Sequence, residues 1–584
     1  MWILALNLTH DASMCLMKDS EIILHLKEER LTHRTHTRNV VNCIDLIKNY
    51  TDHLDYLVFG YLHNFNIDHD PYTFLIEKMG ISVKQVVDAS QKHHDMHAYG
   101  AFCNSGFNDA VCLVVDGAGS DIQYFDHEKN KTSLAGFKFE SEKENESIYE
   151  CNFGEEPICL YKTALGYNSE TVPEDFPRYW QREKRIGMGM VYAGIADAFG
   201  WFRGEGKVMG RSLYGKFDAS IKTMMTKKGA NESLVSLRGT GKYSRIGVEL
   251  VQYDYIKNIF PEVIWDEDIY YIKTTDDTDK VNFDKISNLC YKVQIEFERY
   301  MFNLIQKSLE LSTSKNLILT GGCALNCLAN YKFLKQLPED ITVYVDPVCA
   351  DDGISLAMAK YVYTIHQSNE NKILGDLSLK TLYLGQPIKY EYELSEKESE
   401  RDVTPKEVAE LISHGNIVAI CQGRSESGPR ALGNRSILFD PRVQNGKEIV
   451  NKVKKREWWR PFAGTVLLEH AKEWFDMNRL EESPYMMYAV EVLKNKRKQI
   501  PAITHIDGTC RIQTVTEEQN KNYYNLINEF YKITGVPILF NTSFNLSGDT
   551  IAETIDDAFK TVRNSDIEYM YLPEIQKLVK VKNI

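Results

Sequence analysis

Two histidines stand four positions apart in KHHDMHAYGAFCNS, residues 92–105. If this segment is helical, His93 and His97 leave the same face, close enough to share one metal ion. No Glu follows the first histidine as in the zinc-protease motif His-Glu-x-x-His, so further ligands must come from elsewhere. Asp116 in VVDGAGS and Asp351 in CADDGIS each follow an apolar strand, where open α/β sheets present ligands. Two imidazoles and two carboxylates suit Fe(II), Mn(II) or Zn(II); ordinary core or surface histidines are the alternative.

A second group of reactive side chains lies in the last third of the chain, where basic residues accompany glycines. The segments are CQGRSESGPRALGNRSIL, residues 421–438, and KKREWWRP, residues 454–461. Guanidinium groups pair bidentately with phosphate and ammonium groups add point charge, so this density predicts a polyanion pocket. A solvated basic face and a nucleic-acid site with interleaved aromatic residues are the alternatives. The candidate cations are Arg424, Arg430, Arg435, Lys454, Lys455, Arg456 and Arg460.

Two further turns add polar groups. In GVPILFNTSFN, residues 535–545, a buried strand runs into a turn where Asn541 and Ser543 can bind phosphate or carbonyl oxygens. THIDGTCRIQTV, residues 504–515, contributes Arg511. No serine lies in a nucleophile elbow and no cysteine has a local histidine signature, so covalent catalysis has no support.

Two similar hairpins are expected to position part of this chemistry. ILALNLTHDAS, residues 3–13, and CLVVDGAGS, residues 112–120, each lead an apolar strand into a tight turn with an acid and small residues. Their recurrence predicts a duplicated α/β architecture whose turn amides face a shared ligand, with two unrelated hairpins as the alternative. LTGGCALN, residues 319–326, places two glycines between a strand and a helix, where a phosphorylated ligand could approach the backbone.

Capping and periodicity predict the elements that carry these groups. Ser90 and Gly106 favour the start and the end of a helix around the two histidines. A strand over 316–320, the Gly-Gly turn, a helix over 324–334 and a strand over 342–346 follow the order of a parallel sheet with crossover helices.

The polar composition of residues 366–402 favours a connection between two domains. After it, Thr404 and Pro405 should begin a short helix that Gly415 ends. GEGKVMGRSLYG, residues 204–215, is expected to be either a flexible substrate loop or a turn-rich surface loop.

The composition excludes several classes of protein. The chain has 584 residues, with 69 Lys and Arg against 82 Asp and Glu, for a formal net charge of -13. This balance argues against a surface that binds nucleic acid or anionic membrane throughout, although the stretch from Lys222 to Arg245 is basic. No run approaches the roughly 18 apolar residues of a membrane span, and no signal peptide is apparent. We therefore expect a cytoplasmic protein without membrane contact.

These motifs occur in one order across nearly the whole chain. The sequence resembles the O-carbamoyltransferase family of nodulation-factor, cephamycin and tobramycin biosynthesis, most specifically through GPRALGNRSIL and KKREWWRP. The resemblance implies an α/β protein of two domains. Residues 1–366 would form a duplicated actin-like ATPase fold, similar to the tRNA threonylcarbamoyl transferases, and residues 367–584 a YrdC-like α/β fold.

The resemblance also implies two coupled reactions. The second domain would join carbamoyl phosphate with ATP, accompanied by Mg²⁺, to give carbamoyl adenylate and pyrophosphate. The first domain would move the carbamoyl group to a hydroxyl and release AMP, with iron(II) or a similar ion held by the four ligands above. His10, in the THDAS turn, would take the proton of that hydroxyl.

The resemblance assigns further roles residue by residue. The implied catalytic residues are His10, Arg430, Lys454 and Arg460. Carbamoyl phosphate and ATP would be bound by Arg424, Arg430, Lys454, Lys455, Arg460, Arg511, Asn541 and Ser543. The adenylate would be bound by Asp11, Gly117, Gly119, Lys207, Gly321, Gly322 and Asn326. The metal ligands would be His93, His97, Asp116 and Asp351.

Several alternatives remain open at this point. The acceptor could be a small molecule such as a sugar or nucleoside, or a hydroxymethylated pyrimidine of nucleotides or DNA. A protein of another class would bind nucleotide to change conformation without transferring any group. Arg211 stands where the family usually has an apolar residue, and with the basic stretch it marks a region where acceptor specificity could be set. The resemblance also leaves room for a homodimer.

Overall fold

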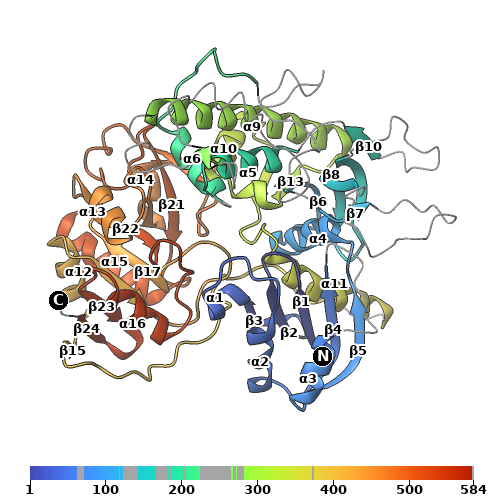
Figure 1. Ribbon diagram of the computed structural model, residues 1–584, viewed down its shortest axis with the longest axis horizontal. Helices are drawn as coiled ribbons and strands as arrows, with labels where there is room; N and C mark the ends of the chain where they lie inside the picture. The colour runs from blue at the N-terminus through green and yellow to red at the C-terminus, as the bar shows by residue number, and fades with distance from the viewer. Residues whose placement is uncertain are drawn as a thin grey trace.

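A computed structural model gives the architecture, in which three mixed sheets follow one another along the chain (Figure 1). In Figure 1 the N-terminal residues (blue) lie at the lower right, the middle of the chain (green) at the top, and the C-terminal third (orange to red) at the left. The structure describes residues 1–61, 71–117, 119–122, 142–165, 180–183, 187–201, 204–223, 265–266, 271–272, 282–370 and 374–581.

The first sheet has the strand order β3-β2-β1-β4-β5. β1 pairs antiparallel with β2, and β2 pairs antiparallel with β3. On its other side β1 pairs parallel with β4, which pairs parallel with β5. The strands are β1 (Trp2–Asn7), β2 (Ser13–Lys18), β3 (Glu21–Lys27), β4 (His53–Gly60) and β5 (Ser82–Asp88), with the short helices α1 (Glu28–Thr32), α2 (Val41–Asp45) and α3 (Pro71–Lys78).

The second sheet repeats this arrangement. β6 pairs antiparallel with β8, which pairs antiparallel with β9, while β6 pairs parallel with β13 and β13 with β14. The same strand order and directions thus occur twice, which confirms the predicted duplicated α/β architecture. The strands are β6 (Asp109–Val115), β7 (Asp121–Ile122), β8 (Glu142–Asn152), β9 (Ile158–Leu165), β10 (Trp180–Glu183), β13 (Asn316–Thr320) and β14 (Thr342–Val345). Two further short strands, β11 (Trp265–Asp266) and β12 (Tyr271–Ile272), pair with each other.

Two helices lie between the two N-terminal sheets and contact each other: α4 carries two candidate ligands, and α11 follows a third, Asp351. α4 (His93–Ser105) ends at Gly106, whose φ of 72° is left-handed as the predicted stop requires. A Cβ on Gly100 of α4 would lie 2.6 Å from Cβ of Ala357 in α11 (Gly353–Asn369), so this glycine allows the close approach. The other helices described in this half are α5 (Met188–Ala198), α6 (Glu205–Ser212), α9 (Phe283–Leu311) and α10 (Cys327–Gln336).

Two expectations for this half need correction. Residues 204–215 were expected to be a loop, but most of them form α6, because the polar and glycine-rich sequence still packs Val208 and Gly210 inward. The helix expected over 324–334 is divided: a 3-10 turn covers Gly322–Leu325 and α10 begins only at Cys327. The division occurs at Asn326, whose side chain accepts the backbone N–H of Ala329 and caps α10.

The C-terminal third forms one mixed sheet of ten strands. Its first helix begins with the predicted Thr404 and Pro405, where Thr404 and Glu407 form a reciprocal capping box, and it leads to Gly415 with φ 82°. The strands are β15 (Glu398–Asp402), β16 (Val418–Cys421), β17 (Arg435–Phe439), β18 (Ala463–Leu467), β19 (Phe475–Asp476), β20 (Ala489–Val492), β21 (Thr509–Val515), β22 (Ile538–Ser543), β23 (Tyr569–Leu572) and β24 (Lys577–Val581). The helices are α12 (Pro405–Ser413), α13 (Gly446–Val453), α14 (Ala471–Trp474), α15 (Lys521–Thr534) and α16 (Ile555–Arg563).

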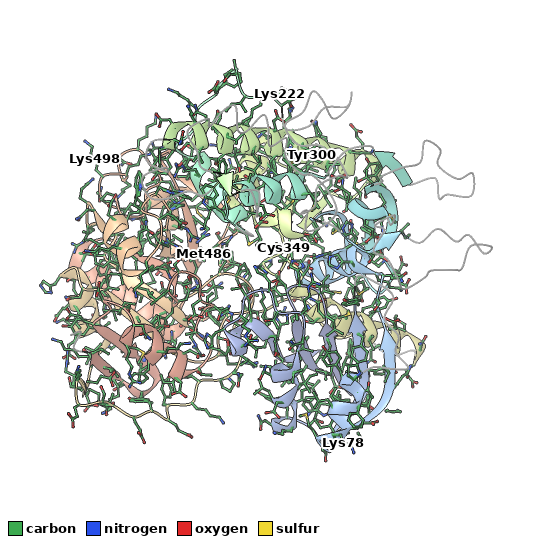
Figure 2. The ribbon with its side chains drawn as sticks, in the orientation of Figure 1. Lys78, Lys222, Tyr300, Cys349, Met486 and Lys498 are labelled. Atoms are coloured by element: carbon green, nitrogen blue, oxygen red, sulfur yellow. The ribbon has the colours of Figure 1, made fainter. Side chains whose placement is uncertain are left out.

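The two halves of the chain meet through a buried apolar cluster. Val348 of the first half packs with Leu382 of the connection and with Leu432, Ala463 and Met486 of the second half. In Figure 2 the labels of Cys349 and Met486 lie near the centre of the molecule, between the two halves. The described connection, residues 374–397, forms neither helix nor strand. A domain boundary at residue 366 stays a prediction.

No helix in the described part of the chain is both long enough and apolar enough to cross a membrane.

Candidate active site

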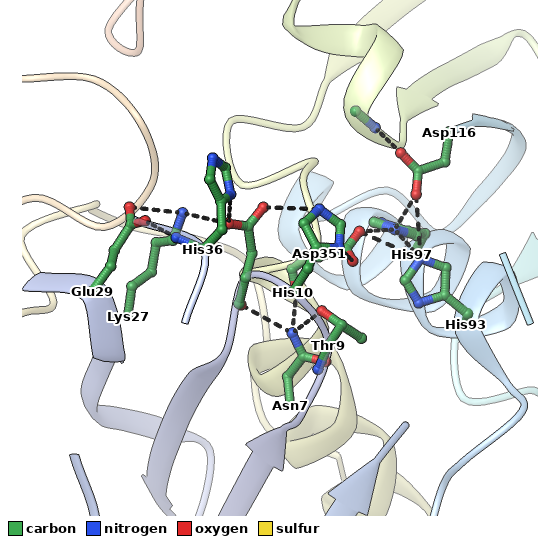
Figure 3. A network of polar contacts seen from close by, with 12 residues as sticks. Asn7, Thr9, His10, Lys27, Glu29, His36, His93, His97, Asp116 and Asp351 are labelled. Atoms are coloured by element: carbon green, nitrogen blue, oxygen red, sulfur yellow. Dashed lines mark hydrogen bonds and ion pairs between the residues drawn. The ribbon is translucent and has the colours of Figure 1, made fainter. Parts of the chain in front are cut away.

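The four predicted metal ligands meet at one point (Figure 3). One ligating atom from each of His93, His97, Asp116 and Asp351 lies within 4.8 Å of the others. The Nε2 atom of His93 is 3.2 Å from Nε2 of His97, 3.3 Å from Oδ2 of Asp116 and 3.4 Å from Oδ1 of Asp351. We call these four residues the metal cluster; that they bind a metal stays a prediction.

The donor set of the metal cluster fits a divalent cation. Ligand atoms about 2.0–2.2 Å from one ion lie roughly 3 Å or more from one another, as these do. Burial by itself would lower the pKa of His93, but Asp351 and Asp116 raise it to about 10. The buried carboxylate of Asp351 and the partly buried carboxylate of Asp116 thus favour positive charge between them, which either protons or a metal ion can supply. A ligand set of two imidazoles and two carboxylates does not discriminate between iron, manganese and zinc.

The glycine turn after β13 holds one ligand of the metal cluster. Oδ1 of Asp116 accepts a hydrogen bond from the backbone N–H of Gly322 at 3.0 Å. Gly321 has a φ of 84°, and a Cβ there would lie 2.4 Å from the carbonyl oxygen of Val115, so the turn requires glycine. The turn therefore positions a ligand carboxylate directly. Adenylate binding by Gly321 and Gly322 stays a prediction.

A second polar group adjoins the metal cluster and is more open to solvent. Nδ1 of His10 lies 3.3 Å from Oδ2 of Asp351, and its Nε2 lies 3.4 Å from Oδ2 of Asp11. Nδ1 of His36 lies 2.9 Å from Oδ1 of Asp11, and Nζ of Lys27 lies 3.5 Å from the same oxygen. The side chains of His10 and His36 are 38% and 34% exposed, whereas that of His93 is 3% exposed. His10 and His36 thus form the open side of the site, and the metal cluster forms its buried side.

His36 was not among the site residues predicted from the sequence. It lies in the polar segment LTHRTHT, residues 31–37, after α1, where neither spacing nor periodicity indicates a partner. The two histidines in that short segment were the available signal.

Basic residues from three separate segments converge in the C-terminal half. Burial and the charge of Arg511 lower the pKa of Arg430 to about 10. Burial, Arg456 and Arg460 hold the pKa of Lys454 well below its ordinary value. These mutual effects show that the side chains lie close enough to repel one another. We call the following residues the cationic cluster: Arg430, Lys454, Arg456, Arg460 and Arg511.

The cationic cluster is only partly neutralised by protein groups. Glu457 is an acidic neighbour of Arg460, with Oε2 3.7 Å from Nη1, but its other oxygen lies 2.6 Å from Nζ of Lys207. The Nε atoms of Arg430 and Arg511 are buried and have no hydrogen-bond partner among the described residues. An anion would relieve both the repulsion and the unpartnered N–H groups.

The NTSFN turn contacts the cationic cluster as expected. Nζ of Lys454 donates to the backbone oxygens of Ser543 and Asn545, the second at 2.7 Å, and lies 3.4 Å from Oγ of Ser543. Asn541 is fully buried, and its amide nitrogen donates to the carbonyl of Ala431 at 3.2 Å and to Oγ1 of Thr465 at 2.9 Å. Asn541 therefore anchors the segment before Leu432, next to Arg430.

A buried glutamate shapes the GPRALGN segment. Oε1 of Glu426 accepts the backbone N–H groups of Leu432, Asn434 and Arg435 at 2.7, 2.8 and 3.1 Å. Arg30, from the N-terminal half, donates to the backbone oxygens of Glu426 and Gly428 at 3.2 and 3.0 Å. This network fixes the loop that carries Arg430.

Three predicted binding residues are used elsewhere. Arg424 donates to backbone oxygens of Gly385 and Leu384, both at 2.8 Å, and so anchors the connection rather than joining the cationic cluster. Lys455 bonds the carbonyl of Asn564 at 3.1 Å, in a separate groove beside Lys452 and Arg563. The buried amide of Asn326 caps α10 and bonds Gln294 and Tyr192. Their ligand-binding roles have no geometric support.

The remaining predicted residues lie near the two clusters. Gly117 follows Asp116 directly, and the backbone N–H of Gly119 donates to the carbonyl of Glu144 at 2.8 Å. Arg211 is fully buried, with its guanidinium 3.6 Å from the ring centre of Phe283 and 5.0 Å from that of Trp459. Arg211 thus joins α6 to the KKREWWRP segment. The basic stretch that begins at Lys222 lies, from residue 224 onward, outside the described residues.

Comparisons with known proteins identify the family of this chain. The family profile "Carbamoyltransferase N-terminus" matches residues 66–359, and "Carbamoyltransferase C-terminus" matches residues 409–578. The nodulation protein NolNO of Sinorhizobium fredii is 30% identical over 96% of this chain and 77% of its own length. The 3'-hydroxymethylcephem-O-carbamoyltransferase of Streptomyces clavuligerus is 31% identical over 45% of this chain and 48% of its own. The protein therefore belongs to the carbamoyltransferase family and is an enzyme of that class.

Proposed function

We propose that the protein forms carbamoyl adenylate at the cationic cluster: water releases phosphate from carbamoyl phosphate, and an oxygen of the resulting carbamate bonds to the α-phosphorus of ATP as pyrophosphate leaves. The carbamoyl group of the adenylate then passes to a hydroxyl at the metal cluster. The observation that carries the proposal is the unbalanced charge of the cationic cluster, with the buried Nε atoms of Arg430 and Arg511 unpartnered among the described residues. Carbamoyl phosphate and the triphosphate of ATP, with Mg²⁺, are anions of the required kind.

The cationic cluster would act mainly by electrostatic stabilisation. The buried ammonium group of Lys454 and the partly buried guanidinium groups interact more strongly with developing negative charge than fully exposed ones, because water screens them less. Lys454, held by the NTSFN turn, and Arg460 would meet the charge that grows as pyrophosphate leaves. Glu457, shared between Arg460 and Lys207, would keep this side of the cluster in place.

The metal cluster would serve the transfer step. A divalent ion, which we propose to be iron(II), would neutralise the phosphate of the adenylate as AMP leaves. His93 and His97 on α4, Asp116 after β6 and Asp351 before α11 would hold that ion. The N–H of Gly322 keeps the carboxylate of Asp116 in its orientation.

One contact joins the two clusters. Nη2 of Arg430 lies 3.4 Å from the carbonyl oxygen of Leu325, which belongs to the same turn as Gly322. An adenylate formed at the cationic cluster would therefore need to move only along this turn to reach the metal cluster. We propose a hydroxyl of a small molecule as the acceptor, since a named relative carbamoylates the hydroxymethyl group of a cephem.

The first half-reaction can be tested without knowing the acceptor. Labelled pyrophosphate should enter ATP only when carbamoyl phosphate is present, because the exchange requires reversible adenylate formation. Arg460→Ala should reduce this exchange by about 10²–10³-fold, as loss of one electrostatic donor does in comparable sites. Arg401→Ala, on the exposed strand β15, is the matched control. An exchange rate in Arg460→Ala equal to that of the wild type, or exchange that proceeds without carbamoyl phosphate, would contradict the proposal.

A further inference from the structure

His36 forms a histidine–aspartate pair at the open side of the site. Its Nδ1 lies 2.9 Å from Oδ1 of Asp11, while its Nε2 has no polar partner among the described residues. In Figure 3 a dashed line starts at one ring nitrogen of His36, and the other ring nitrogen is turned away from that contact. When one ring nitrogen donates to a carboxylate, the other keeps a lone pair and can accept a proton.

His10, to which the resemblance assigned proton removal, has a different environment. Its Nδ1 faces Asp351 at 3.3 Å and its Nε2 faces Asp11 at 3.4 Å. Both nitrogens are therefore directed at carboxylates, and neither is free to accept the proton of a hydroxyl. The position suits a residue that holds Asp11 and Asp351 at a fixed separation.

Asp11 is suited to orient His36. Burial would raise the pKa of Asp11, but Lys27, the hydrogen bond from His36 and His10 together keep it below its usual value. The carboxylate therefore remains ionised and fixes the proton of His36 on Nδ1. Lys27 also lies 3.1 Å from Glu29, so its charge is shared between two acids.

The backbone holds His36 in a conformation that needs support. Its φ of 60° is left-handed, which is uncommon and costly for a residue other than glycine. Two contacts maintain it: the N–H of His36 donates to Oε2 of Glu29 at 3.1 Å, and the carbonyl of Thr37 accepts the N–H of Ala12 at 3.1 Å. The second contact ties the His36 segment to the turn that carries His10 and Asp11. Such strained residues occur preferentially at functional sites.

We propose that His36 accepts the proton of the acceptor hydroxyl during carbamoyl transfer, with Asp11 as its positioning residue. The inference rests on the proposed function. As Nε2 takes the proton, the hydroxyl oxygen forms a bond to the carbamoyl carbon, and the bond from that carbon to the phosphate oxygen breaks. AMP leaves with the electron pair of the broken bond. The products are the carbamate ester and AMP, and the proton on His36 then passes to solvent.

The two half-reactions allow a decisive test. The exchange of pyrophosphate into ATP reports adenylate formation, and methyl carbamate formed in molar methanol, detected by mass spectrometry, reports transfer to a hydroxyl. His36→Ala should keep the exchange rate of the wild type and lose transfer by about 10²–10⁴-fold, the usual contribution of a general base. Added imidazole should restore part of the transfer, which a purely structural role would not explain. His53→Ala, an exposed histidine on β4, should match the wild type in both assays.

The outcomes separate this inference from the proposed function. Wild-type protein without carbamoyl phosphate-dependent exchange would refute the proposed function itself. With exchange intact, transfer that survives in His36→Ala would overturn the role of His36. Loss of both activities in His36→Ala, with unfolding unchanged, would also overturn it, because the residue would then serve adenylate formation.

Discussion

The Nε2 atom of His33, in the N-terminal half, lies 2.8 Å from Oδ1 of Asp557, in the C-terminal half. The other ring nitrogen lies 3.0 Å from Oδ1 of Asp549. His33 precedes His36 by three residues, and Asp549 follows the NTSFN turn that holds Lys454. The segment with His33 and His36 thus contacts Asp11, next to the metal cluster, on one side and the loop beside the cationic cluster on the other.

Replacing His33 should therefore weaken the junction between the halves. His33→Ala removes two hydrogen bonds to carboxylates, worth about 1–3 kcal/mol together at a partly exposed site. The midpoint of thermal unfolding should fall by roughly 2–12 °C, since each kcal/mol shifts it by about 2–4 °C in units of 150–250 residues. Differential scanning calorimetry of His33→Ala beside His53→Ala measures this. An unchanged midpoint would mean that the contact does not stabilise the junction.

Metal content should depend on α4. The double variant His93→Ala, His97→Ala removes two of four ligands, so protein purified without chelator should lose most of its bound metal. Elemental analysis by mass spectrometry compares it with the wild type and with His53→Ala. Equal metal content in the double variant and the wild type would remove the metal cluster as the binding site. The same analysis identifies the metal.

Removing one cation from the cationic cluster should weaken ligand binding without lowering the stability of the ligand-free protein. Arg460→Gln relieves the repulsion between Arg460 and Arg511. Among the described residues, the substitution removes only a 3.7 Å ion pair between the Arg460 side chain and Glu457. The free variant should unfold at a temperature no lower than that of the wild type. Carbamoyl phosphate and ATP should raise the midpoint of the wild type, because ligands that bind only the folded state stabilise it, but not that of the variant. A variant that the ligands stabilise equally would contradict the assigned pocket.

An ion pair between the covered side chain of Glu398 and the exposed side chain of Arg563 predicts a pH dependence of stability. Both oxygens of Glu398 accept from the guanidinium of Arg563, at 2.7 and 2.8 Å, and this hydrogen bonding lowers the pKa of Glu398 to about 2. Because the folded-state pKa lies below the unfolded value of about 4.5, the stabilisation is present above pH 4.5 and is lost as the pH falls towards 2. Glu398→Gln should cost about 1 kcal/mol at pH 7, after allowance for screening by solvent.

The measurement for this pair is urea unfolding of the wild type and Glu398→Gln at pH 7 and near pH 2.5. The difference between the two midpoints should be clear at pH 7 and small at the acidic pH. Glu400→Gln, on the same strand and paired at 3.6 Å with Lys577, is the matched control. A difference that grows as the pH falls would show that the sign is wrong.

Local chemistry in the sequence was sufficient for several elements. The Thr404–Pro405 start and the Gly106 and Gly415 stops were predicted because capping groups and left-handed glycines act over a few residues. The four residues of the metal cluster were also indicated by the sequence, since His93 and His97 share a helix face and strand ends collect at one edge.

Tertiary structure decided the rest, because it depends on contacts between residues far apart in the chain. The sequence placed Arg424 and Lys455 with Arg430 and Lys454, but packing against the connection and against α16 directs the first two elsewhere. No sequence pattern near His36 indicates that Asp11 is its partner. Only the pairing of β1 with β2, and the turn between them, brings that carboxylate within 2.9 Å of the ring, whose other nitrogen has no polar partner in the described part of the chain. Composition and spacing therefore determined which chemistry the chain carries, and long-range packing determined which side chains perform it.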